Sequence, residues 1–424
     1  MNKLYIEGNK KLNGNVLISG SKNAALPILF MTILTKEKIE ISNIPKLTDI
    51  SIAIKILRSL GIKIVNKNKT LYIDPSVINI SCPSYNLTNK IRASIWMLSP
   101  LLTRFGKAKI FFPGGCKIGC RPINLHLKGL IELGAKIVEN ENYIIASIQK
   151  PLQGKYIYME KVSVGATITI MSAAILARGL TIIDNAAKEP EIIDVAKFLN
   201  TLGANITGSG SNKIYIKGVL KLHGGFHKII PDRIETGTFL IAAAISQGLI
   251  TCYNTEPKHL TNVLKKLSET GAKIQTGKDW IKLDMKEKKP KSVNISTSPY
   301  PGFPTDMQSQ FTLLNSISSG KSVIIENIFE NRFSYVTELI KMGAKIEIKN
   351  NYIICKGIPK LYAKNLFSTD LRGSATLILA GCIAKGITVV NNIHHFKRGY
   401  ESFLKKLNKL GANIQYINNN FSIF

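Results

Sequence analysis

The chain has 424 residues, is 45% hydrophobic and carries a formal net charge of +30. This length suffices for two or more domains with their own cores, and the hydrophobic content excludes a disordered chain. Apolar runs stay shorter than the roughly 18 to 20 residues that cross a bilayer, and the six cysteines, apart from Cys116 and Cys120, are widely spaced. Residues 1–8 predict a strand rather than a signal peptide. We therefore expect a soluble protein of a reducing compartment, most simply the cytoplasm.

The lysines are spread along the whole chain, often next to asparagine and isoleucine. An arginine-rich tail, a Cys/His finger and an aromatic-basic motif, which are typical of nucleic-acid binding, are all missing from the sequence. We interpret the charge as a compositional drift on solvated surfaces and predict neither a nucleic-acid nor a membrane partner. A small anionic substrate also fits, because it needs only a few focused charges.

One segment recurs along the chain: an amphipathic helix, a turn similar to Gly-Ala-Lys-Ile, and a strand. The six turn glycines are Gly61, Gly134, Gly203, Gly271, Gly343 and Gly411. Subtracting successive numbers gives spacings of 73, 69, 68, 72 and 68 residues, which chance does not produce. Each glycine predicts a left-handed helix cap with a strand directly after it. A short hairpin follows most copies, for example at 206–217 and 346–356.

Each repeat also holds an earlier helix of a different character. Residues 165–177, 235–246 and 373–384 are apolar almost all round, which predicts helices buried inside a domain. A strand follows each of them, so one repeat consists of helix, strand, helix and hairpin. Three repeats can close around their buried helices. The sequence therefore predicts two similar α/β domains with a boundary near residue 230.

Polar residues stand at the starts of the buried helices. They are Ser21, Lys22, Asn23, Arg92, Ser163, Glu235, Gln308 and Arg372. Helix N-termini present unpaired N–H groups and a partial positive charge, which suit anions. A cleft between the domains lined by such termini is a candidate phosphate site. Ordinary helix capping with solvated charges is the alternative for each residue alone.

Residues 113–122 form a glycine-rich stretch with Cys116 in its middle. The glycines let the backbone bend sharply and approach a ligand closely. Lys117 and Arg121 favour the thiolate of a nearby cysteine, so Cys116 is a candidate nucleophile or proton donor. A mobile surface loop with an incidental cysteine is the alternative. We exclude metal binding by Cys116 and Cys120, because no further Cys/His pair lies nearby to complete four ligands.

Over essentially its whole length, the sequence resembles the enolpyruvyl transferases. The motifs that carry the resemblance lie at 20–27, 113–122, 161–167, 231–238, 304–308, 330–333 and 370–373. Within this family the chain is similar to the branch that uses UDP-N-acetylglucosamine. The shikimate-type branch has a Lys-Ser pair in place of Lys22-Asn23 and lacks the cysteine loop. It remains a distant alternative.

The resemblance implies two inside-out α/β barrel domains with the active site in the cleft between them. Residues 21–230 would carry the cysteine loop, and residues 1–20 plus 231–424 would carry the general base. The implied reaction transfers the enolpyruvyl group of phosphoenolpyruvate to the 3′-hydroxyl of UDP-N-acetylglucosamine and releases phosphate. It proceeds by addition and elimination through a tetrahedral ketal, with no cofactor and no metal. It is the first committed step of peptidoglycan precursor synthesis and thus of cell-wall biogenesis.

The resemblance also implies roles for individual residues. Cys116 would protonate the methylene of phosphoenolpyruvate and could form a covalent adduct with it, and Asp306 would deprotonate the sugar hydroxyl. Asn23 and Asp370 would lie at the reacting centre. The residues that would hold the phosphate and carboxylate are Lys22, Arg121, Arg372 and Arg398. Capping of a following helix is the alternative role of Asp306 and Asp370.

For the nucleotide sugar, the resemblance points to a larger group of residues. They are Arg92, Arg121, Pro122, Ile123, Asn124, Leu125, Lys161, Val162, Ser163, Val164, Asp306 and Ile328. Asn124 departs from the family, which commonly has an aspartate beside the uracil. Asparagine keeps a carbonyl acceptor but loses the charge. Cys120 also replaces a small residue that is more usual there.

Two further classes of function stay open from the sequence. A nucleic-acid-binding protein of the same fold would account for the net charge of +30. An inactive homologue with a structural role is the other alternative, and the presence of Cys116, Asp306, Lys22 and Arg398 together argues against it.

Overall fold

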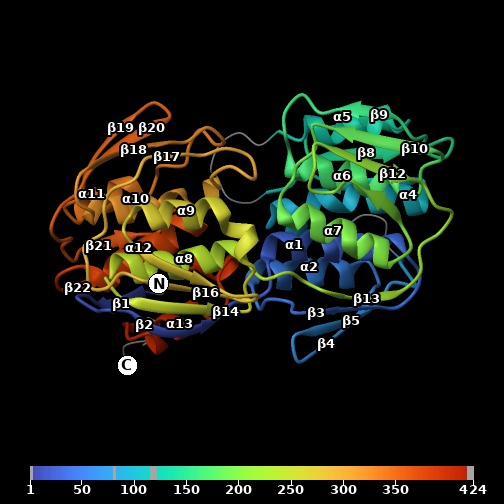
Figure 1. The fold of residues 1–424 in the computed structure, drawn as a ribbon. Coiled ribbons are helices and arrows are strands. Elements are labelled where there is room, and N and C mark those ends of the chain that lie inside the picture. Colours follow the sequence, from blue (N-terminus) through green and yellow to red (C-terminus); the bar gives the residue numbers. More distant parts are fainter. Residues whose placement is uncertain (1–2, 80–82, 115–121, 418–424) are drawn as a thin grey trace. The chain divides into compact units, whose positions relative to one another are not determined.

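The computed structural model describes residues 3–79, 83–114 and 122–417, which form two compact units (Figure 1). Of these residues, the first unit contains 20–79, 83–114 and 122–230, and the second contains 3–19 and 231–417. Each unit has a hydrophobic core of its own.

The first unit alternates helices with short strands. Its helices are α1 (Lys22–Met31), η1 (Thr32–Leu34), α2 (Thr48–Ser59), α3 (Tyr85–Thr88), η2 (Arg92–Met97), α4 (Leu98–Phe105), α5 (Asn124–Glu132), α6 (Val164–Ala174) and α7 (Pro190–Thr201), where η marks a 3₁₀ helix. Its strands are β3 (Ile39–Ser42), β4 (Lys63–Lys67), β5 (Thr70–Asp74), β6 (Lys107–Phe111), β7 (Lys136–Glu139), β8 (Tyr143–Ser147), β9 (Tyr156–Tyr158), β10 (Leu180–Asp184), β11 (Asn205–Thr207), β12 (Lys213–Lys217) and β13 (Gly225–Lys228).

The second unit follows the same alternation. Its helices are α8 (Arg233–Ile245), η3 (Pro257–Leu260), α9 (Thr261–Glu269), η4 (Thr305–Met307), α10 (Gln308–Ile317), α11 (Val336–Lys341), α12 (Leu371–Ile383), η5 (Phe396–Arg398) and α13 (Phe403–Lys409). Its strands are β1 (Lys3–Glu7), β2 (Asn13–Leu17), β14 (Leu249–Tyr253), β15 (Lys273–Thr276), β16 (Trp280–Asp284), β17 (Ile295–Ser296), β18 (Lys321–Ile325), β19 (Lys345–Lys349), β20 (Tyr352–Lys356), β21 (Asn365–Phe367), β22 (Ile387–Asn391) and β23 (Asn413–Ile417).

Four of the six sheets formed by the described residues share one plan. A hairpin pairs antiparallel with a third strand, and a fourth strand joins parallel to that third strand, as in the order β11-β12-β10-β9. The other orders are β13-β3-β5-β4, β15-β16-β14-β2, β17-β18-β20-β19, β21-β22-β1-β23 and the three-stranded β6-β8-β7. In these strands buried and exposed residues alternate, so that one face of each sheet covers the core (β12 is an example).

The predicted helix caps are confirmed at all six turn glycines. Their φ angles lie between +95° and +104°, a left-handed conformation that suits glycine because it has no Cβ. The six residues are Gly61, Gly134, Gly203, Gly271, Gly343 and Gly411. Each cap ends an amphipathic helix and turns the chain directly into the hairpin that follows.

The buried helices are also confirmed. In the second unit every residue of α8 and α10, and all but the last of α12, is buried, and α10 packs against both of the others. Figure 1 shows these three helices inside the unit, with strands around them. In the first unit α4 packs against α6, and α1 packs against η2. The predicted α/β class with buried helices is therefore correct.

The sequence did not predict the parallel strand that completes each of the five four-stranded sheets in the described residues. These strands have two to five residues, for example β17 and β9, and lack a long alternating pattern. The chain's first strand was predicted, but its place was not. β1 pairs antiparallel with both β22 and β23 and so completes the last repeat with residues from the start of the chain.

Candidate active site

Lys22 and Asn23 open helix α1 in the first unit. Ser21 caps this helix, since its hydroxyl accepts a hydrogen bond from the backbone N–H of Ala24. The Lys22 ammonium lies 3.6 Å from a carboxylate oxygen of Asp49, and the two side chains are only 13% and 5% exposed. Lys22 is therefore a nearly buried cation whose direction is constrained by a buried acid on α2.

Arg92 begins η2 and faces His126 of α5. Nδ1 of His126 lies 2.8 Å from the Thr169 hydroxyl, and the Trp96 indole donates to the Gly165 carbonyl over 3.1 Å. The pKa of His126 is lowered to about 3, mainly because the imidazole is buried and to a smaller extent because of the positive charge of Arg92. The imidazole is consequently neutral, and it fixes α5 against the start of α6.

The start of α6 is close-packed. A Cβ on Gly165 would lie only 2.8 Å from Nε2 of His126, so a larger residue would push the two helices apart. Ser163 caps α6 by accepting from the Ala166 N–H over 3.2 Å. The other predicted residues of this segment are exposed Lys161 and half-buried Val162 and Val164. The structure thus brings the predicted α6 segment beside Arg92.

The described part of the segment after the cysteine loop leads into α5. Pro122 and Asn124 are exposed, Leu125 is half-buried, and Ile123 is buried in the core. Asn124 is the first residue of α5, two positions before His126. Cys116 and Arg121, for which we predicted the proton-donor and phosphate-binding roles, lie outside the described residues.

In the second unit, Asp306 lies between two arginines. Its Oδ1 accepts from Nη2 of Arg332 over 2.5 Å, and its Oδ2 accepts from Nη2 of Arg372 over 2.8 Å. The guanidinium side chains are 7% and 6% exposed, whereas the Asp306 side chain is 26% exposed. Burial by itself would raise the pKa of Asp306, but the two guanidinium charges outweigh it and hold this pKa well below its ordinary value. Asp306 is therefore an anion throughout the neutral range.

Asp370 caps α12. One of its oxygens accepts from the backbone N–H groups of Arg372 and Gly373, both over 2.9 Å, and its other oxygen accepts from the Ser334 hydroxyl. The capping role is thus real, and the same contacts fix the start of the helix that carries Arg372. Arg398 ends η5 and is half-buried. The pKa of the neighbouring His395 is lowered, mainly by burial and to a smaller extent by the charges of His394 and Arg398.

Ile328 lies at a tight turn after β18 and is 37% exposed. The turn is formed around buried Glu326, whose Oε1 accepts from the N–H groups of Ile328 and Phe329 over 2.9 and 3.1 Å. The other oxygen of Glu326 accepts from the Thr305 hydroxyl over 2.8 Å. Glu326 therefore links the Ile328 turn to the segment that carries Asp306.

Glu235 and Gln308, two of the polar residues noted at helix starts, are bound to other side chains inside the second unit. Glu235 is buried, accepts from Lys406 over 2.6 Å and accepts from the Ser19 N–H over 2.9 Å. Gln308 is also buried, and its carbonyl accepts from the Tyr335 hydroxyl over 2.9 Å. Both residues stabilise the interior of the second unit.

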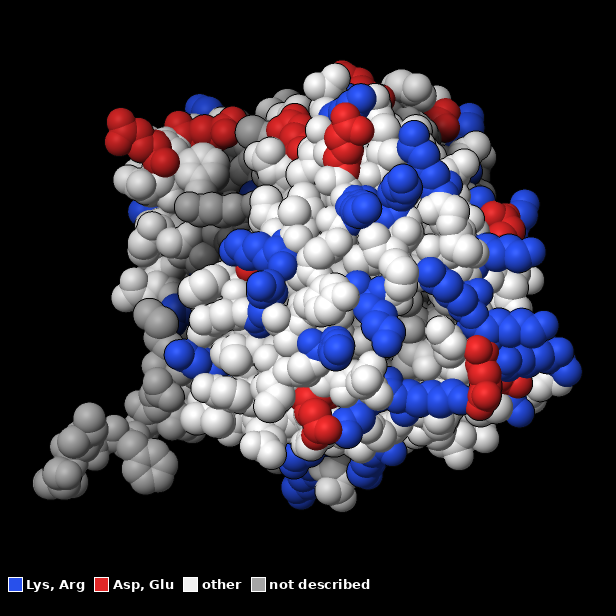
Figure 2. All heavy atoms as spheres, turned by 90° about the vertical axis from the view of Figure 1, so that its left-hand side faces the viewer, with Lys and Arg blue, Asp and Glu red and all other residues white. Residues whose placement is uncertain are grey.

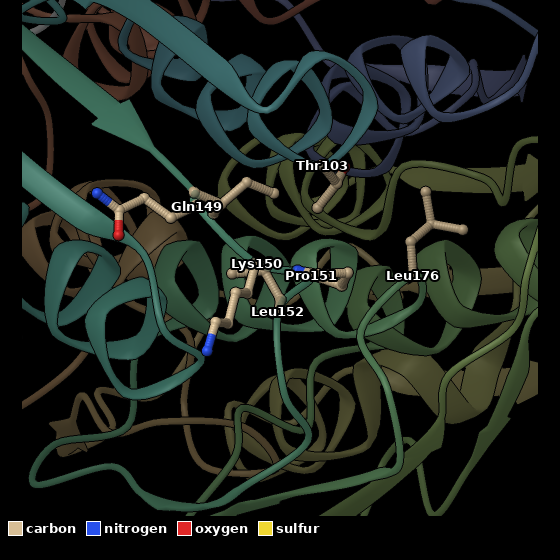
Figure 3. Close-up of a pocket in the computed structure, with 7 residues that line it drawn as sticks. Thr103, Gln149, Lys150, Pro151, Leu152 and Leu176 are labelled. Atoms are coloured by element: carbon tan, nitrogen blue, oxygen red, sulfur yellow. The ribbon is translucent and has the colours of Figure 1, made fainter.

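A further pocket lies in the first unit, away from the predicted residues. It has a volume of about 280 Å³ and is lined by Thr103, Ile148, Gln149, Lys150, Pro151, Leu152 and Leu176. Figure 3 shows the polar ends of Gln149 and Lys150 pointing away from Thr103 and Leu176. The remaining lining is mostly aliphatic, so the pocket lacks the grouped acids and cations that the predicted chemistry needs.

Surface charge, metal-ligand groups and helix length add three observations. On the face shown in Figure 2, lysine and arginine side chains are scattered among uncharged residues rather than gathered in one stripe. Within residues 3–79, 83–114 and 122–417, no group of three or more His, Cys, Asp or Glu residues could hold a metal ion. In the same part of the chain, no helix is both long and apolar enough to cross a membrane.

Known proteins match this chain over nearly its full length. The family described as EPSP synthase (3-phosphoshikimate 1-carboxyvinyltransferase) matches residues 6–407. The chain belongs to this family, the enolpyruvyl transferases. A UDP-N-acetylglucosamine 1-carboxyvinyltransferase from Buchnera aphidicola subsp. Schizaphis graminum is 76% identical, over 98% of this chain and all of the relative. The protein of that name from Cronobacter sakazakii is 57% identical, over 98% of this chain and 99% of its own.

Solved structures share the fold of this enolpyruvyl transferase. The enolpyruvyl transferase NikO from Streptomyces tendae superposes with a TM-score of 0.88 at 23% identity, over 98% of both chains. An EPSP synthase from Acinetobacter baumannii gives a TM-score of 0.78 at 17% identity, over 99% of this chain and 100% of its own. At these identities the likeness concerns the fold alone.

Sequence analysis of this enolpyruvyl transferase missed three residues of the candidate site. Arg332 lies in a motif that carried the resemblance, at 330–333, but no role was assigned to it. Asp49 and His126 lie inside helices with ordinary amphipathic patterns, so only their buried contacts with Lys22 and Thr169 reveal them.

Proposed function

We propose that this chain transfers the enolpyruvyl group of phosphoenolpyruvate to the 3′-hydroxyl of UDP-N-acetylglucosamine and releases phosphate. The observation that carries the proposal is the 76% identity, over 98% of this chain, to a protein named for this transfer. The named relatives favour this reaction over the shikimate-type alternative. The product would enter peptidoglycan precursor synthesis, and we propose the cytoplasm as the place of the reaction.

The first step forms a bond between the sugar oxygen and the central carbon of phosphoenolpyruvate. The hydroxyl proton passes to Asp306, while the methylene carbon takes a proton from the Cys116 thiol. The anionic state of Asp306, caused by Arg332 and Arg372, leaves it ready to accept a proton. The product of this step is a tetrahedral ketal.

The second step breaks the bond between that carbon and the phosphate oxygen. The methyl group formed in the first step returns a proton to the Cys116 thiolate, the double bond re-forms, and phosphate leaves with the bonding electrons. Cationic side chains stabilise the charge that develops on the phosphate. We assign this role to Lys22, Arg121, Arg372 and Arg398, of which Lys22 and Arg372 are nearly buried and therefore act with little screening by water.

The nucleotide sugar would contact the residues around the start of α6. Arg92 and Lys161 supply cations for the diphosphate, and the N-terminus of α6 adds N–H groups and a partial positive charge. The side-chain carbonyl of Asn124 would accept a hydrogen bond from the N–H group of the uracil. Since the proposed acid and base come from different units, we also propose that substrate binding brings the two units together around the reacting groups.

The experiment is an assay of phosphate release from phosphoenolpyruvate with and without UDP-N-acetylglucosamine. Release that requires the nucleotide sugar supports the proposal. Shikimate 3-phosphate serves as the control acceptor, and release that requires it instead would assign the chain to the other branch.

A further inference from the structure

A pocket in the second unit lies between helix α9 and the sheet of β17, β18, β20 and β19 (Figure 1). Its volume is about 470 Å³, within the range of about 300–1,000 Å³ that is typical of ligand pockets. Helix α9 contributes Asn262, Lys265 and Lys266 to the lining. The sheet contributes Val323 and Ile325, both of which are half-buried. The pocket therefore combines aliphatic and cationic groups, and the proposed reaction uses none of these residues.

Three lysines lie side by side on the same sheet. In the pairing of β18, β20 and β19, Lys321 is opposite Lys356, and Lys356 is opposite Lys345. Residues that are opposite one another in neighbouring strands point to the same face, so these exposed side chains form one row, which we call the lysine row. Lys321 is two residues before Val323 and shares its face. The lysine row therefore borders the pocket.

The lysine row is unfavourable for the chain by itself, because like charges directly opposite one another destabilise a sheet. Among the residues that the structure describes, no carboxylate forms an ion pair with the lysine row or with Lys265. Two acids close to them in the sequence are themselves paired. Glu347 lies 2.9 Å from Lys349, and Glu269 lies 2.7 Å from Lys266. The surface is thus complementary to an anion supplied by another molecule.

The pocket is also lined by β17, which is an end strand of its sheet. On one side β17 pairs with β18, and the N–H of Thr297 directly after it donates to the Ile325 carbonyl over 2.9 Å. Backbone groups of successive residues in a strand point to opposite sides, so the N–H and carbonyl of Ser296 point away from β18. An extended peptide can form hydrogen bonds with such an edge.

We propose that the pocket and the lysine row form a docking surface for an acidic, extended segment of a partner protein. Its apolar side chains would pack on Val323 and Ile325, and its carboxylates would lie against the lysine row and Lys265. A second copy of this chain is a poor occupant, since two molecules with a net charge of +30 repel each other.

A single-stranded nucleic acid fits this surface less well than a peptide does. Binding of single strands relies on exposed aromatic rings on which the bases stack. The described strands β17, β18, β19 and β20 present one aromatic side chain on the face of the lysine row, and this residue, Tyr352, is half-buried. The aliphatic and cationic groups are the dominant features, so they favour a peptide.

The test measures binding of a fluorescein-labelled peptide, four glutamates followed by Val-Thr-Val-Thr, by fluorescence anisotropy. The acidic half matches the lysine row, and the β-branched half matches the pocket and the strand edge. The double variant Lys321→Gln/Lys356→Gln should weaken binding roughly three- to tenfold. The matched control Lys385→Gln/Lys409→Gln removes the same charge from exposed positions on other elements of the unit, and should change binding less than about twofold. Val323→Glu places a negative charge in the pocket and should weaken binding at least about tenfold.

Four results would overturn the proposal. Equal weakening in the two double variants would show a general attraction to the cationic chain, and undiminished binding by Val323→Glu would exclude the pocket. A short single strand of thymidines that binds more tightly than the peptide, and that loses affinity in Lys321→Gln/Lys356→Gln, would assign the surface to nucleic acid. No binding of the peptide by the unmodified chain would exclude the docking surface altogether.

A second readout needs no ligand. Lys356→Gln removes the central charge of the lysine row, so it should raise the melting temperature at low salt more than Lys409→Gln does. This difference should disappear at about 1 M salt, where the charges are screened. An equal or lower melting temperature of Lys356→Gln at low salt would show that the row carries no repulsion for a partner to relieve, and would contradict the proposal.

Discussion

The ammonium of Lys22 lies 3.6 Å from the Asp49 carboxylate, and both side chains are nearly buried. Asp49→Asn removes the negative charge opposite Lys22, so we expect a loss of stability of about 1–3 kcal/mol. Phosphoenolpyruvate supplies a replacement charge and should raise the melting temperature more in Asp49→Asn than in the unmodified chain. Both measurements are made in a Cys116→Ser background to avoid a covalent adduct. Equal increases in melting temperature in the two proteins would show that Lys22 does not contact phosphoenolpyruvate.

An epoxide phosphonate such as fosfomycin should modify Cys116. Three other cysteines are poor competitors: burial raises the pKa of Cys252 above its usual range, and raises the pKa values of Cys355 and Cys382 to about 12. Their thiolate fraction at neutral pH is thus very small. Peptide mass mapping after treatment identifies the modified residue. An adduct on Cys120 or elsewhere, with Cys116 unmodified, would refute its assignment.

Cys116→Asp should keep substantial turnover and lose sensitivity to fosfomycin, whereas Cys116→Ser should be much weaker. A carboxylic acid can donate the proton that the thiol donates, but a serine hydroxyl is far too weak an acid. Because the aspartate must be protonated to act, the pH optimum of Cys116→Asp should shift towards acid. The measurement is steady-state phosphate release across pH. Two inactive variants would indicate that the covalent adduct is obligatory.

The buried imidazole of His126 should make the chain less stable in acid. Its folded pKa is about 3, and the ordinary value in an unfolded chain is about 6.5. Between these values the unfolded state binds the extra proton, so stability falls as the pH drops below 6.5, by up to about 1.4 kcal/mol per unit from this group. The neutral variant His126→Gln should therefore show a shallower decline of the urea midpoint between pH 7 and 5. An equally steep decline of the urea midpoint in His126→Gln and in the unmodified chain would exclude this role of His126.

The fold was predictable from the sequence because its signals are local. The glycine caps repeat at regular spacing, and helices such as α12 are apolar on all sides, which marks them as buried. The pairing of β1 with β22 and β23 was not predictable in the same way. It joins residues that lie from 380 (Glu7 and Ile387) to 414 (Lys3 and Ile417) positions apart, and no local pattern encodes such a distance.

The candidate site was predictable only where residue type and motif coincide, as at Asp306 and Lys22. The partners that tune these residues were missed because they act through tertiary contacts. Arg332 reaches Asp306 from 26 residues away, and its motif at 330–333 does not by itself show which side chain it contacts.

The most direct test of the central claim is to identify the product of the chain with both substrates present. Mass spectrometry should show UDP-N-acetylglucosamine gaining one enolpyruvyl group while an equal amount of phosphate is released. Asp306→Asn should form this product far more slowly, since the amide cannot accept the hydroxyl proton. An unchanged nucleotide sugar in the presence of the unmodified, folded chain would contradict the account.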